Sequence, residues 1–297
     1  MSKFEALLEN FQTDKKIRIG IVNAADEAAI KAVFHPKIRE FLKPVLIGDE
    51  AAIRGILSKL NESAEIIPAA TDEECAQIGV KLTKDKQIDF LMKGHLSTRT
   101  FLRAVVNKEH GISGGRLLGH IVLDDVPAYH KLLLTTDGGM VLKPDKEEKK
   151  QLIAYSIEVM NKIGVAKPKV ALLAASESVN PKVPSSVEAE EIMREIQAEA
   201  PESCDIDGPI SLDLAVSKEI ARQKEYDSAV AGDADILVGP DITTMNVLGK
   251  SLTVLAGGEM AGIIMGAEVP IVMVSRASTE NEKMYAILMA MYCSKED

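Results

Sequence analysis

The residues with the clearest chemical potential are a serine and an arginine near the end of the chain. Ser275 and Arg276 directly follow the apolar run from Ile271 to Val274, which has the length of a strand. Ligands of open α/β sheets bind beyond the carboxyl ends of the strands. A guanidinium beside a hydroxyl suits the oxygens of a phosphate, because both groups donate hydrogen bonds. The pair therefore predicts an anion site, against the structural alternatives of a surface ion pair for Arg276 and a helix cap for Ser275.

Two polar residues follow a second strand-like run, from Ile236 to Val238. Asp241 comes after a glycine and a proline, which favours a turn or a helix cap. Asn246 lies near the start of the next predicted helix, where we expect its amide to be buried and to need partners at both ends. Structural capping and direct contact with a substrate both remain open for Asn246.

The chain that must position these residues alternates strand and helix signals. The run from Ile17 to Val22 is followed by capping residues at 23–26 that begin a helix. Further apolar runs of strand length start at Val45, Asp89, His120, Lys169, Ala234 and Pro270. Helical patterns from Glu147 to Ile163 and from Val187 to Ala198 separate such runs. Short apolar strands alternating with helices of ten or more residues predict parallel βαβ units, so the fold class is α/β.

Composition narrows the class of protein and of partner. With 297 residues, of which 46% are hydrophobic, the chain can bury one large core or two ordinary ones, and we expect two lobes. The formal charge of −10 argues against nucleic acid or a membrane surface as a partner, because both are negatively charged. An anionic ligand must therefore be held by a local cluster of cations.

The cysteines and the apolar stretches predict a cytoplasmic protein. Cys75, Cys204 and Cys293 lie far apart and form no CxxC spacing, as expected of reduced thiols. Residues 1–16 have an amphipathic helical pattern without the basic and apolar regions of a signal peptide. The longest apolar stretch, from Ala261 to Val274, is interrupted by glycines, a glutamate and a proline, so it does not predict a membrane span.

Seven segments, in order along the chain, resemble the phosphate acetyl/butyryltransferase family. They read KPVLIGDEAAI, MKGHLSTRTFLRAVV, TTDGGMVLKPD, ALLAASES, DGPISLDLAV, GDADILVGPD and VPIVMVSRA. Single motifs often mislead, but seven in one order over roughly 250 residues identify the chain as a member of that family. The short chain and the SRAS form of the last motif are more similar to the butyryl branch than to the acetyl branch, whose counterpart reads SRGC.

The resemblance implies a fold, a domain organisation and an assembly. The family has a two-lobed αβα sandwich with mostly parallel sheets, similar to isocitrate and isopropylmalate dehydrogenases. For this chain it implies a first α/β lobe from residues 1–118 and 271–297, a second from residues 119–270, and a ligand cleft between them. It also implies a homodimer. The apolar positions of 187–198 and 212–220 would supply part of the contact, unless they pack on the lobe's own sheet.

The reaction that the resemblance implies is the exchange of CoA and phosphate on a short-chain acyl group, butyryl or branched-chain. Acyl-CoA and inorganic phosphate give acyl phosphate and CoA, with CoA as a substrate and with neither a metal nor a redox cofactor. Arg276 and Arg103 would bind the acyl phosphate, and Ser275 or a backbone N–H would stabilise the oxyanion. No covalent enzyme intermediate is required.

Three further residues complete the implied substrate site. Arg103 lies where the family has an arginine in a STADTVRP-like segment, with an exposed helix arginine as the structural alternative. Thr98, with Ser97 beside it, can cap the same helix and leave N–H groups to hold anion oxygens. Arg116, after two glycines, is a second-rank phosphate candidate, and whether Arg99 points into the cleft is open.

The general base is the assignment that the resemblance constrains least. The acetyl branch has an aspartate seven residues after the motif serine, and that spacing leads here to Glu282, whose carboxylate would accept the thiol proton of CoA. A gap of one residue would place Lys283 there instead. Glu280 and Glu282 also fit first-turn acids that stabilise the amino terminus of a helix.

Other functions remain open on the sequence, beside a transferase specific for acetyl groups. A metal- and NADP-dependent decarboxylating dehydrogenase would share the fold, but the chain has neither a dinucleotide fingerprint nor an aspartate triad. A non-catalytic protein that binds CoA or acyl phosphate would keep the anion site and lack the base. Catalytic release of thiol distinguishes an enzyme from such a binding protein.

Overall fold

The structure is a computed structural model that describes residues 2–274 and 278–295. The chain divides into two compact units, a first unit of Glu5–Leu118 and Ala261–Asp297 and a second unit of Met1–Phe4 and Gly119–Met260. The predicted domains differ in two places: residues 1–4 belong to the second unit, and the chain returns to the first unit at Ala261 and not at residue 271. The early return has a physical reason, because Ile263 and Ile264 already pair with the last strand of the first unit.

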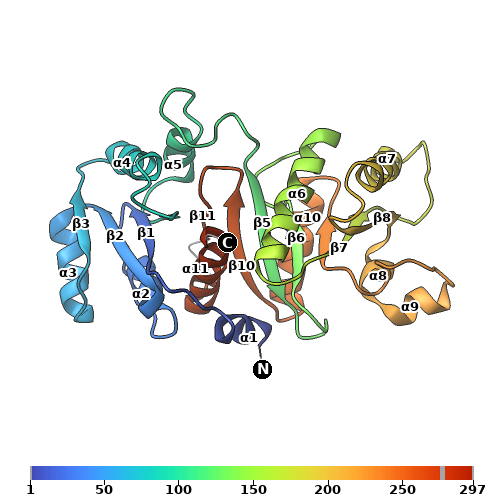
Figure 1. Cartoon of the computed structure of the whole chain (residues 1–297), viewed down its shortest axis with the longest axis horizontal. Coiled ribbons are helices and arrows are strands. Elements are labelled where there is room, and N and C mark those ends of the chain that lie inside the picture. The colour runs from blue at the N-terminus through green and yellow to red at the C-terminus, as the bar shows by residue number, and fades with distance from the viewer. Residues whose placement is uncertain (1, 275–277, 296–297) are drawn as a thin grey trace. The chain divides into compact units, whose positions relative to one another are not determined.

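The first unit has a mostly parallel sheet (Figure 1). Its strands are ordered β3-β2-β1-β4-β11-β10, and among them β10 is antiparallel to its neighbour β11. They are β1 (Ile17–Val22), β2 (Leu42–Gly48), β3 (Glu65–Pro68), β4 (Phe90–Lys93), β10 (Glu259–Met265) and β11 (Ile271–Val272). In β1, five of six residues are buried, as expected of a parallel strand that is covered on both faces.

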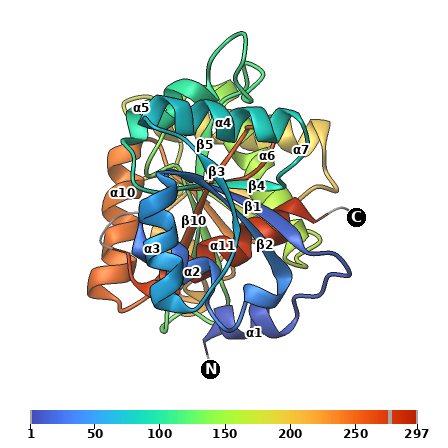
Figure 2. The ribbon, with the colours of Figure 1, turned by 90° about the vertical axis from the view of Figure 1, so that its left-hand side faces the viewer.

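Helices cover both faces of this sheet. Figure 2 shows α4 and α5 on one side of β1, β2 and β4, with α2, α3 and α11 on the other side. The first two residues of α1 (Lys3–Glu9) belong to the second unit and the rest to the first. The other helices of the first unit are α2 (Glu27–Val33), the short 3-10 helix η1 (Arg39–Phe41), α3 (Glu50–Leu60), α4 (Asp72–Lys84), α5 (Thr98–Val105) and α11 (Glu280–Ser294). Side-chain oxygens of Asp26, Asp49, Thr71 and Ser97 accept backbone N–H bonds at the starts of α2, α3, α4 and α5, which fixes where each helix begins.

The second unit has a sheet ordered β5-β6-β9-β7-β8, in which β5 is antiparallel to β6 and the other neighbours are parallel. Its strands are β5 (Gly119–Asp125), β6 (Leu133–Thr136), β7 (Lys169–Leu173), β8 (Asp205–Ile210) and β9 (Ile236–Val238). Its helices are α6 (Lys146–Lys162), α7 (Pro184–Glu199), α8 (Leu212–Val216), α9 (Lys218–Gln223), α10 (Ile242–Lys250) and the π-helical segment η2 (Ser251–Leu255). One core joins α8, α9 and α10 to the sheet through Leu214, Ala221, Met245, Ala171 and Leu237.

The predicted fold class is confirmed, because both units are α/β and their sheets are mostly parallel. Each of the seven predicted apolar runs contains a strand. The sequence pattern did not predict four of the strands, β3, β6, β8 and β10. Two of them, β3 (EIIP) and β8 (DIDGPI), lie at ends of the strand order and carry polar residues and proline, as edge strands do. Within residues 2–274 and 278–295, none of the helices combines the length and apolar character needed to cross a bilayer.

Candidate active site

Polar residues gather in the second unit where β6 and β9 end. Thr136 is paired with Val238, so the two parallel strands end side by side. After β9 the chain turns into α10, and Asp241 caps this helix. Its carboxylate accepts hydrogen bonds from the backbone N–H of Thr244 at 2.9 Å and from the hydroxyl of Thr244 at 3.1 Å. The cap role predicted for Asp241 is confirmed.

Asn246 lies inside α10, more than one turn beyond its cap, and is exposed. Its amide Nδ2 donates to the carbonyl oxygen of Gly138 at 2.9 Å. A Cβ at position 138 would lie 3.1 Å from the backbone of Met245, so glycine allows this close approach of the loop to the helix. The prediction of a buried amide at the helix start is therefore wrong, since Asp241 is the cap and Asn246 joins α10 to the loop after β6. Contact between Asn246 and a substrate stays a prediction.

Asp137 and His120 lie at the same edge and are absent from the sequence prediction. The Asp137 carboxylate accepts from the backbone N–H groups of Gly139, Met140 and His120 at 2.8, 2.7 and 2.8 Å. The Nδ1 atom of His120 is buried and has no hydrogen-bond partner in the described part of the chain. Burial lowers the pKa of His120, against the opposing charge of Asp137, so the imidazole is neutral at neutral pH. The Asp-Gly dipeptide at 137–138, two threonines after the apolar residues 132–134, was the signal available for this loop.

In the first unit, the turn after β4 is held in place by a residue that follows β1. Asn23 adopts the left-handed backbone conformation, with φ at 53°. Its Nδ2 donates to the Asp72 carboxylate at 2.7 Å and to the carbonyl oxygen of His95 at 2.9 Å. Since β4 pairs in parallel with both β1 and β11, these bonds position the start of α5 at the carboxyl edge of three neighbouring strands.

Ser97 is the cap of α5, and Thr98 is its first residue. The Ser97 hydroxyl accepts a hydrogen bond from the backbone N–H of Thr100 at 3.0 Å. Thr98 is exposed, and its hydroxyl has no partner among the described residues. A contact between Thr98 and an anion stays a prediction.

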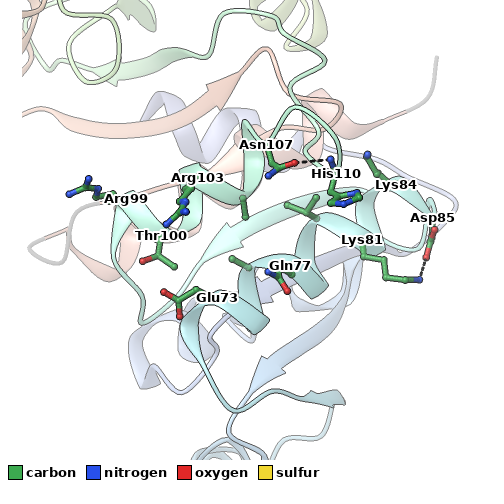
Figure 3. A pocket seen from close by; sticks show the side chains of 13 residues that line it. Glu73, Gln77, Lys81, Lys84, Asp85, Arg99, Thr100, Arg103, Asn107 and His110 are labelled. Carbon is green, nitrogen blue, oxygen red and sulfur yellow. Dashed lines mark hydrogen bonds and ion pairs between the residues drawn. The ribbon is translucent and has the colours of Figure 1, made fainter.

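Arg103 lies on the second turn of α5 and lines a groove between α5 and α4 (Figure 3). Figure 3 shows its side chain pointing into the groove, with Arg99 at the end of the groove. Both arginines are exposed, and neither has an ion-pair partner among residues 2–274 and 278–295. Arg99 and Arg103 lie four residues apart on α5, so the predicted helix already placed them on one face, and the structure adds that α4 forms the other wall of the groove.

Arg116 has a structural contact. Its Nη2 donates to the carbonyl oxygen of Ala267 at 2.8 Å, which ties the loop before β5 to the loop between β10 and β11. Gly114 and Gly115 precede it with φ of 57° and 77°, values that favour glycine. A phosphate contact for Arg116 stays a prediction.

Glu282 belongs to a capping box at the start of α11. The Thr279 hydroxyl accepts from the Glu282 N–H at 3.1 Å, and the Glu282 carboxylate accepts from the Thr279 N–H at 2.8 Å. This geometry supports the first-turn interpretation, and a catalytic role for Glu282 stays a prediction. Lys283 is buried and donates from Nζ to the carbonyl oxygen of Ser278, whose hydroxyl is buried without a partner in the described chain.

The predicted anion pair, Ser275 and Arg276, lies outside the described residues. The strand that precedes it, β11, ends at Val272 and is two residues shorter than the predicted run. Across the described ranges, no group of three or more His, Cys, Asp or Glu side chains has the arrangement needed to hold a metal ion.

Comparison with known proteins gives three matches that bear on this site. The model of the family described as "Phosphate acetyl/butaryl transferase" matches residues 69–291. A Bacillus subtilis protein named "Probable phosphate butyryltransferase" is 35% identical over 295 residues, which cover 99% of each chain. The phosphate acetyltransferase of Thermotoga maritima is 34% identical over 276 residues, covering 92% of this chain and 94% of the relative.

Solved structures give matches that agree with these sequence relatives. A branched-chain phosphotransacylase from Enterococcus faecalis superposes with a TM-score of 0.82 at 30% identity, covering 95% of this chain and all of the other. A 4-hydroxythreonine-4-phosphate dehydrogenase from Burkholderia phymatum matches at a TM-score of 0.57 and 14% identity, which is a likeness of fold alone. The family match spans well over half of the chain, and the relatives match along almost all of it. The chain belongs to the phosphate acetyl/butyryl transferase family.

Proposed function

We propose that this protein exchanges CoA and phosphate on a short-chain acyl group, so that acyl-CoA and phosphate give acyl phosphate and CoA. The observation that carries the proposal is the likeness, over 99% of both chains, to a relative named for phosphate butyryl transfer. The family's reaction is an acyl transfer between two nucleophiles. It needs a held phosphate, an oriented thiol and donors for the oxyanion.

The proposed residue roles follow the chemistry of each side chain. Arg276 and Ser275 take the phosphate oxygens, and Ser275 or a backbone N–H donates to the tetrahedral oxyanion. Lys283 is buried, and its Nζ donates to the carbonyl oxygen of Ser278, which follows Arg276 by two residues in the chain. Glu282 accepts the thiol proton of CoA, while its second carboxylate oxygen is free of the helix cap. We expect no metal or redox cofactor to take part.

We further propose that the acyl group is butyryl or branched-chain. The support is the butyryl name of the Bacillus subtilis relative and the branched-chain name of the Enterococcus faecalis structure, against an acetyl name for a relative of almost equal identity. Burial of each extra methylene adds about 0.8 kcal/mol, so a pocket that accepts butyryl should favour it about tenfold over acetyl.

The test is release of CoA thiol from acetyl-, butyryl-, isobutyryl- and isovaleryl-CoA in the presence of phosphate. The proposal expects kcat/KM to be highest for a four- or five-carbon acyl group. A tenfold preference for acetyl-CoA would instead make the protein an acetyl-specific transferase. Stoichiometric binding without turnover on any of the four would make it a non-catalytic CoA or acyl phosphate binding protein.

A homodimer, with the second unit in the contact, is part of the proposal, but the surface differs from the predicted one. The apolar residues Ile192 and Ile196 of α7 and Leu214 of α8 are buried within the second unit itself. Leu212 of the predicted surface is 39% exposed, whereas three more exposed large apolar side chains lie on α10 and η2: Val247, Val254 and Leu255 are 60%, 78% and 83% exposed. Clustered apolar residues of this kind mark contacts between subunits.

Sedimentation equilibrium at micromolar protein tests the dimer. We expect a mass twice that of the 32.1 kDa chain, and a shift toward the monomer when Leu255 is replaced by glutamate. A monomeric wild-type protein at this concentration would contradict the proposal. We also propose a cytoplasmic location, because Cys75 and Cys204 are buried free thiols.

A further inference from the structure

The imidazole of His120 has one nitrogen inside the second unit and one at its surface. His120 is the second residue of β5, and part of it is exposed. Its Nδ1 is buried without a partner in the described chain, and a Cβ at position 139 would lie 2.6 Å from it, so this edge of the ring packs on the backbone of Gly139. Nε2 is not among the buried atoms without a partner, and no described residue forms a hydrogen bond with it. Nε2 is therefore available to a ligand.

Hydrogen bonds fix the backbone on both sides of this ring. The N–H of His120 donates to the Asp137 carboxylate at 2.8 Å, and its carbonyl oxygen accepts from the Thr136 hydroxyl at 3.1 Å. The same carboxylate accepts from two N–H groups of its own loop, and Asn246 binds that loop from α10. Nε2 therefore has a defined position at the edge where β6 and β9 end, and a group held in this way loses little freedom when it binds a ligand.

The burial of Nδ1 decides which nitrogen of His120 carries the proton. A proton on Nδ1 would bury an N–H donor without an acceptor, which is rarer in proteins than a buried acceptor without a donor. Burial also lowers the pKa of His120, although the charge of Asp137 acts in the opposite direction, so the ring is neutral at neutral pH. The neutral ring therefore carries its single proton on Nε2, which makes Nε2–H a fixed hydrogen-bond donor.

A neutral donor at this edge suits a carbonyl oxygen better than a phosphate. The carboxylates that the contacts above place here belong to Asp137 and Asp241, and each accepts from N–H groups of its own turn. Their charge repels a phosphate dianion, which proteins bind with arginine forks. A thioester is uncharged when it binds. Its carbonyl oxygen gains negative charge in the transition state, where a fixed N–H donor stabilises it most.

We propose that the Nε2–H group of His120 donates to the carbonyl oxygen of the acyl group and stabilises the tetrahedral oxyanion. The proposal rests on the exchange reaction proposed above, and it adds a side-chain donor to Ser275. An oxygen of hydrogen phosphate forms a bond to the carbonyl carbon, the π electrons move onto the carbonyl oxygen, and His120 keeps its proton throughout. The C=O bond then re-forms as the C–S bond breaks. Its electron pair goes to sulfur, and the proton of the hydrogen phosphate ends on the thiol.

The first experiment compares phosphorolysis of butyryl-CoA by wild type and by three variants of His120. His120→Ala should lower kcat by about 100-fold or more, the loss expected for one oxyanion donor, and change KM for butyryl-CoA and phosphate less than about threefold. His120→Gln places an amide N–H close to the position of Nε2 and should recover kcat to within about tenfold of wild type. His120→Asn reaches only the position of Nδ1 and should stay as slow as His120→Ala.

A second histidine of the same unit provides the matched control. His130 pairs with Asp233 at 2.7 Å, before the start of β9, and His130→Gln should leave kcat and both KM values unchanged. Thermal unfolding of each variant separates loss of structure from loss of the donor. A folded His120→Ala with the wild-type kcat, or a folded His120→Gln that is no faster than His120→Asn, would overturn the proposal.

Nitrogen-15 NMR of protein labelled in its five histidines tests the donor without turnover. The signals that His120→Gln removes belong to His120. We expect a neutral ring with its proton on Nε2 at neutral pH, and a change in the Nε2–H signal with butyryl-CoA that CoA alone does not produce. That change in a protein that forms no acyl phosphate would support the donor and contradict the proposed reaction. A proton on Nδ1, a charged ring, no change, or the same change with CoA would overturn the donor.

Discussion

Replacing Arg276 with alanine should reduce phosphate-dependent turnover by about 30- to 1,000-fold, the loss of about 2 to 4 kcal/mol expected for a charge-assisted contact in a catalytic site. The reason is the guanidinium fork that directly follows Ser275 after the strand signal. The measurement is kcat/KM for phosphate with butyryl-CoA as acyl donor. Arg276→Lys keeps the charge without the fork and should recover part of the activity.

The control for this variant is an arginine on the surface of the second unit. Arg222 of α9 donates to the carbonyl oxygen of Lys218 and should be replaceable by alanine without loss of activity. Thermal unfolding of both variants checks that the fold is intact. If Arg276→Ala is folded and keeps the wild-type rate and the wild-type affinity for phosphate, the assigned anion site is wrong.

Replacing Asp124 with asparagine should change how the free energy of unfolding depends on pH. Asp124 lies in β5, is 1% exposed, and accepts one hydrogen bond, from Thr135 at 2.9 Å, while its other oxygen has no partner in the described chain. Burial raises the pKa of Asp124 to about 7, although the hydrogen bond from Thr135 acts in the opposite direction. Between the unfolded pKa near 4 and the folded pKa, the folded state holds a proton that the unfolded chain has released.

Stability should therefore fall as pH rises through that window and level off above pH 7. From pH 5 to pH 8 the loss is about 3 kcal/mol, two pKa units at about 1.4 kcal/mol each. The asparagine of Asp124→Asn cannot titrate, so the variant should not lose this stability. The unfolding free energy of the variant minus that of the wild type should therefore rise by that amount from pH 5 to pH 8. Urea unfolding at each pH measures it, and a difference that stays constant would contradict the buried acid.

The neighbouring aspartate provides a control of opposite sign. Asp125 accepts hydrogen bonds from Ser2 and from the backbone and side chain of Lys3. Burial acts to raise its pKa, but these hydrogen bonds and the charge of Lys3 outweigh burial and lower it. Its stabilising effect is present above the unfolded pKa and is lost as pH falls through the folded pKa. Asp125→Asn should therefore destabilise the protein at neutral pH and have little effect in acid.

Strands that are buried on both faces were predictable, because their sequences are nearly continuous apolar runs. The strand β1 (IRIGIV) is the clearest example, and its predicted bounds are those of the structure. The strands β8 (DIDGPI) and β10 (EMAGIIM) were not predictable in the same way, since one lies at the end of the strand order and the other begins with a polar residue and contains glycine. Their places depend on pairing between distant segments.

The features of the candidate site are also of two kinds, those that a local sequence pattern predicts and those that depend on contacts between distant segments. Local chemistry was available in the sequence: Thr279 followed three residues later by Glu282 is the signature of a capping box, and Asp241 before Thr244 is that of a helix cap. Contacts between distant segments were not available. The bond from Asn246 to Gly138 spans 108 residues, and the groove that holds Arg103 exists only because α4 packs against α5 with small side chains.

The measurement that tests the central claim most directly is release of CoA thiol from butyryl-CoA by the purified protein, with and without inorganic phosphate. Acyl phosphate is quantified in the same samples. The account predicts many turnovers per chain that depend on phosphate, with one acyl phosphate formed for each thiol released. Thiol release at the same rate without phosphate, or no turnover of any of the four acyl-CoA substrates, would contradict it.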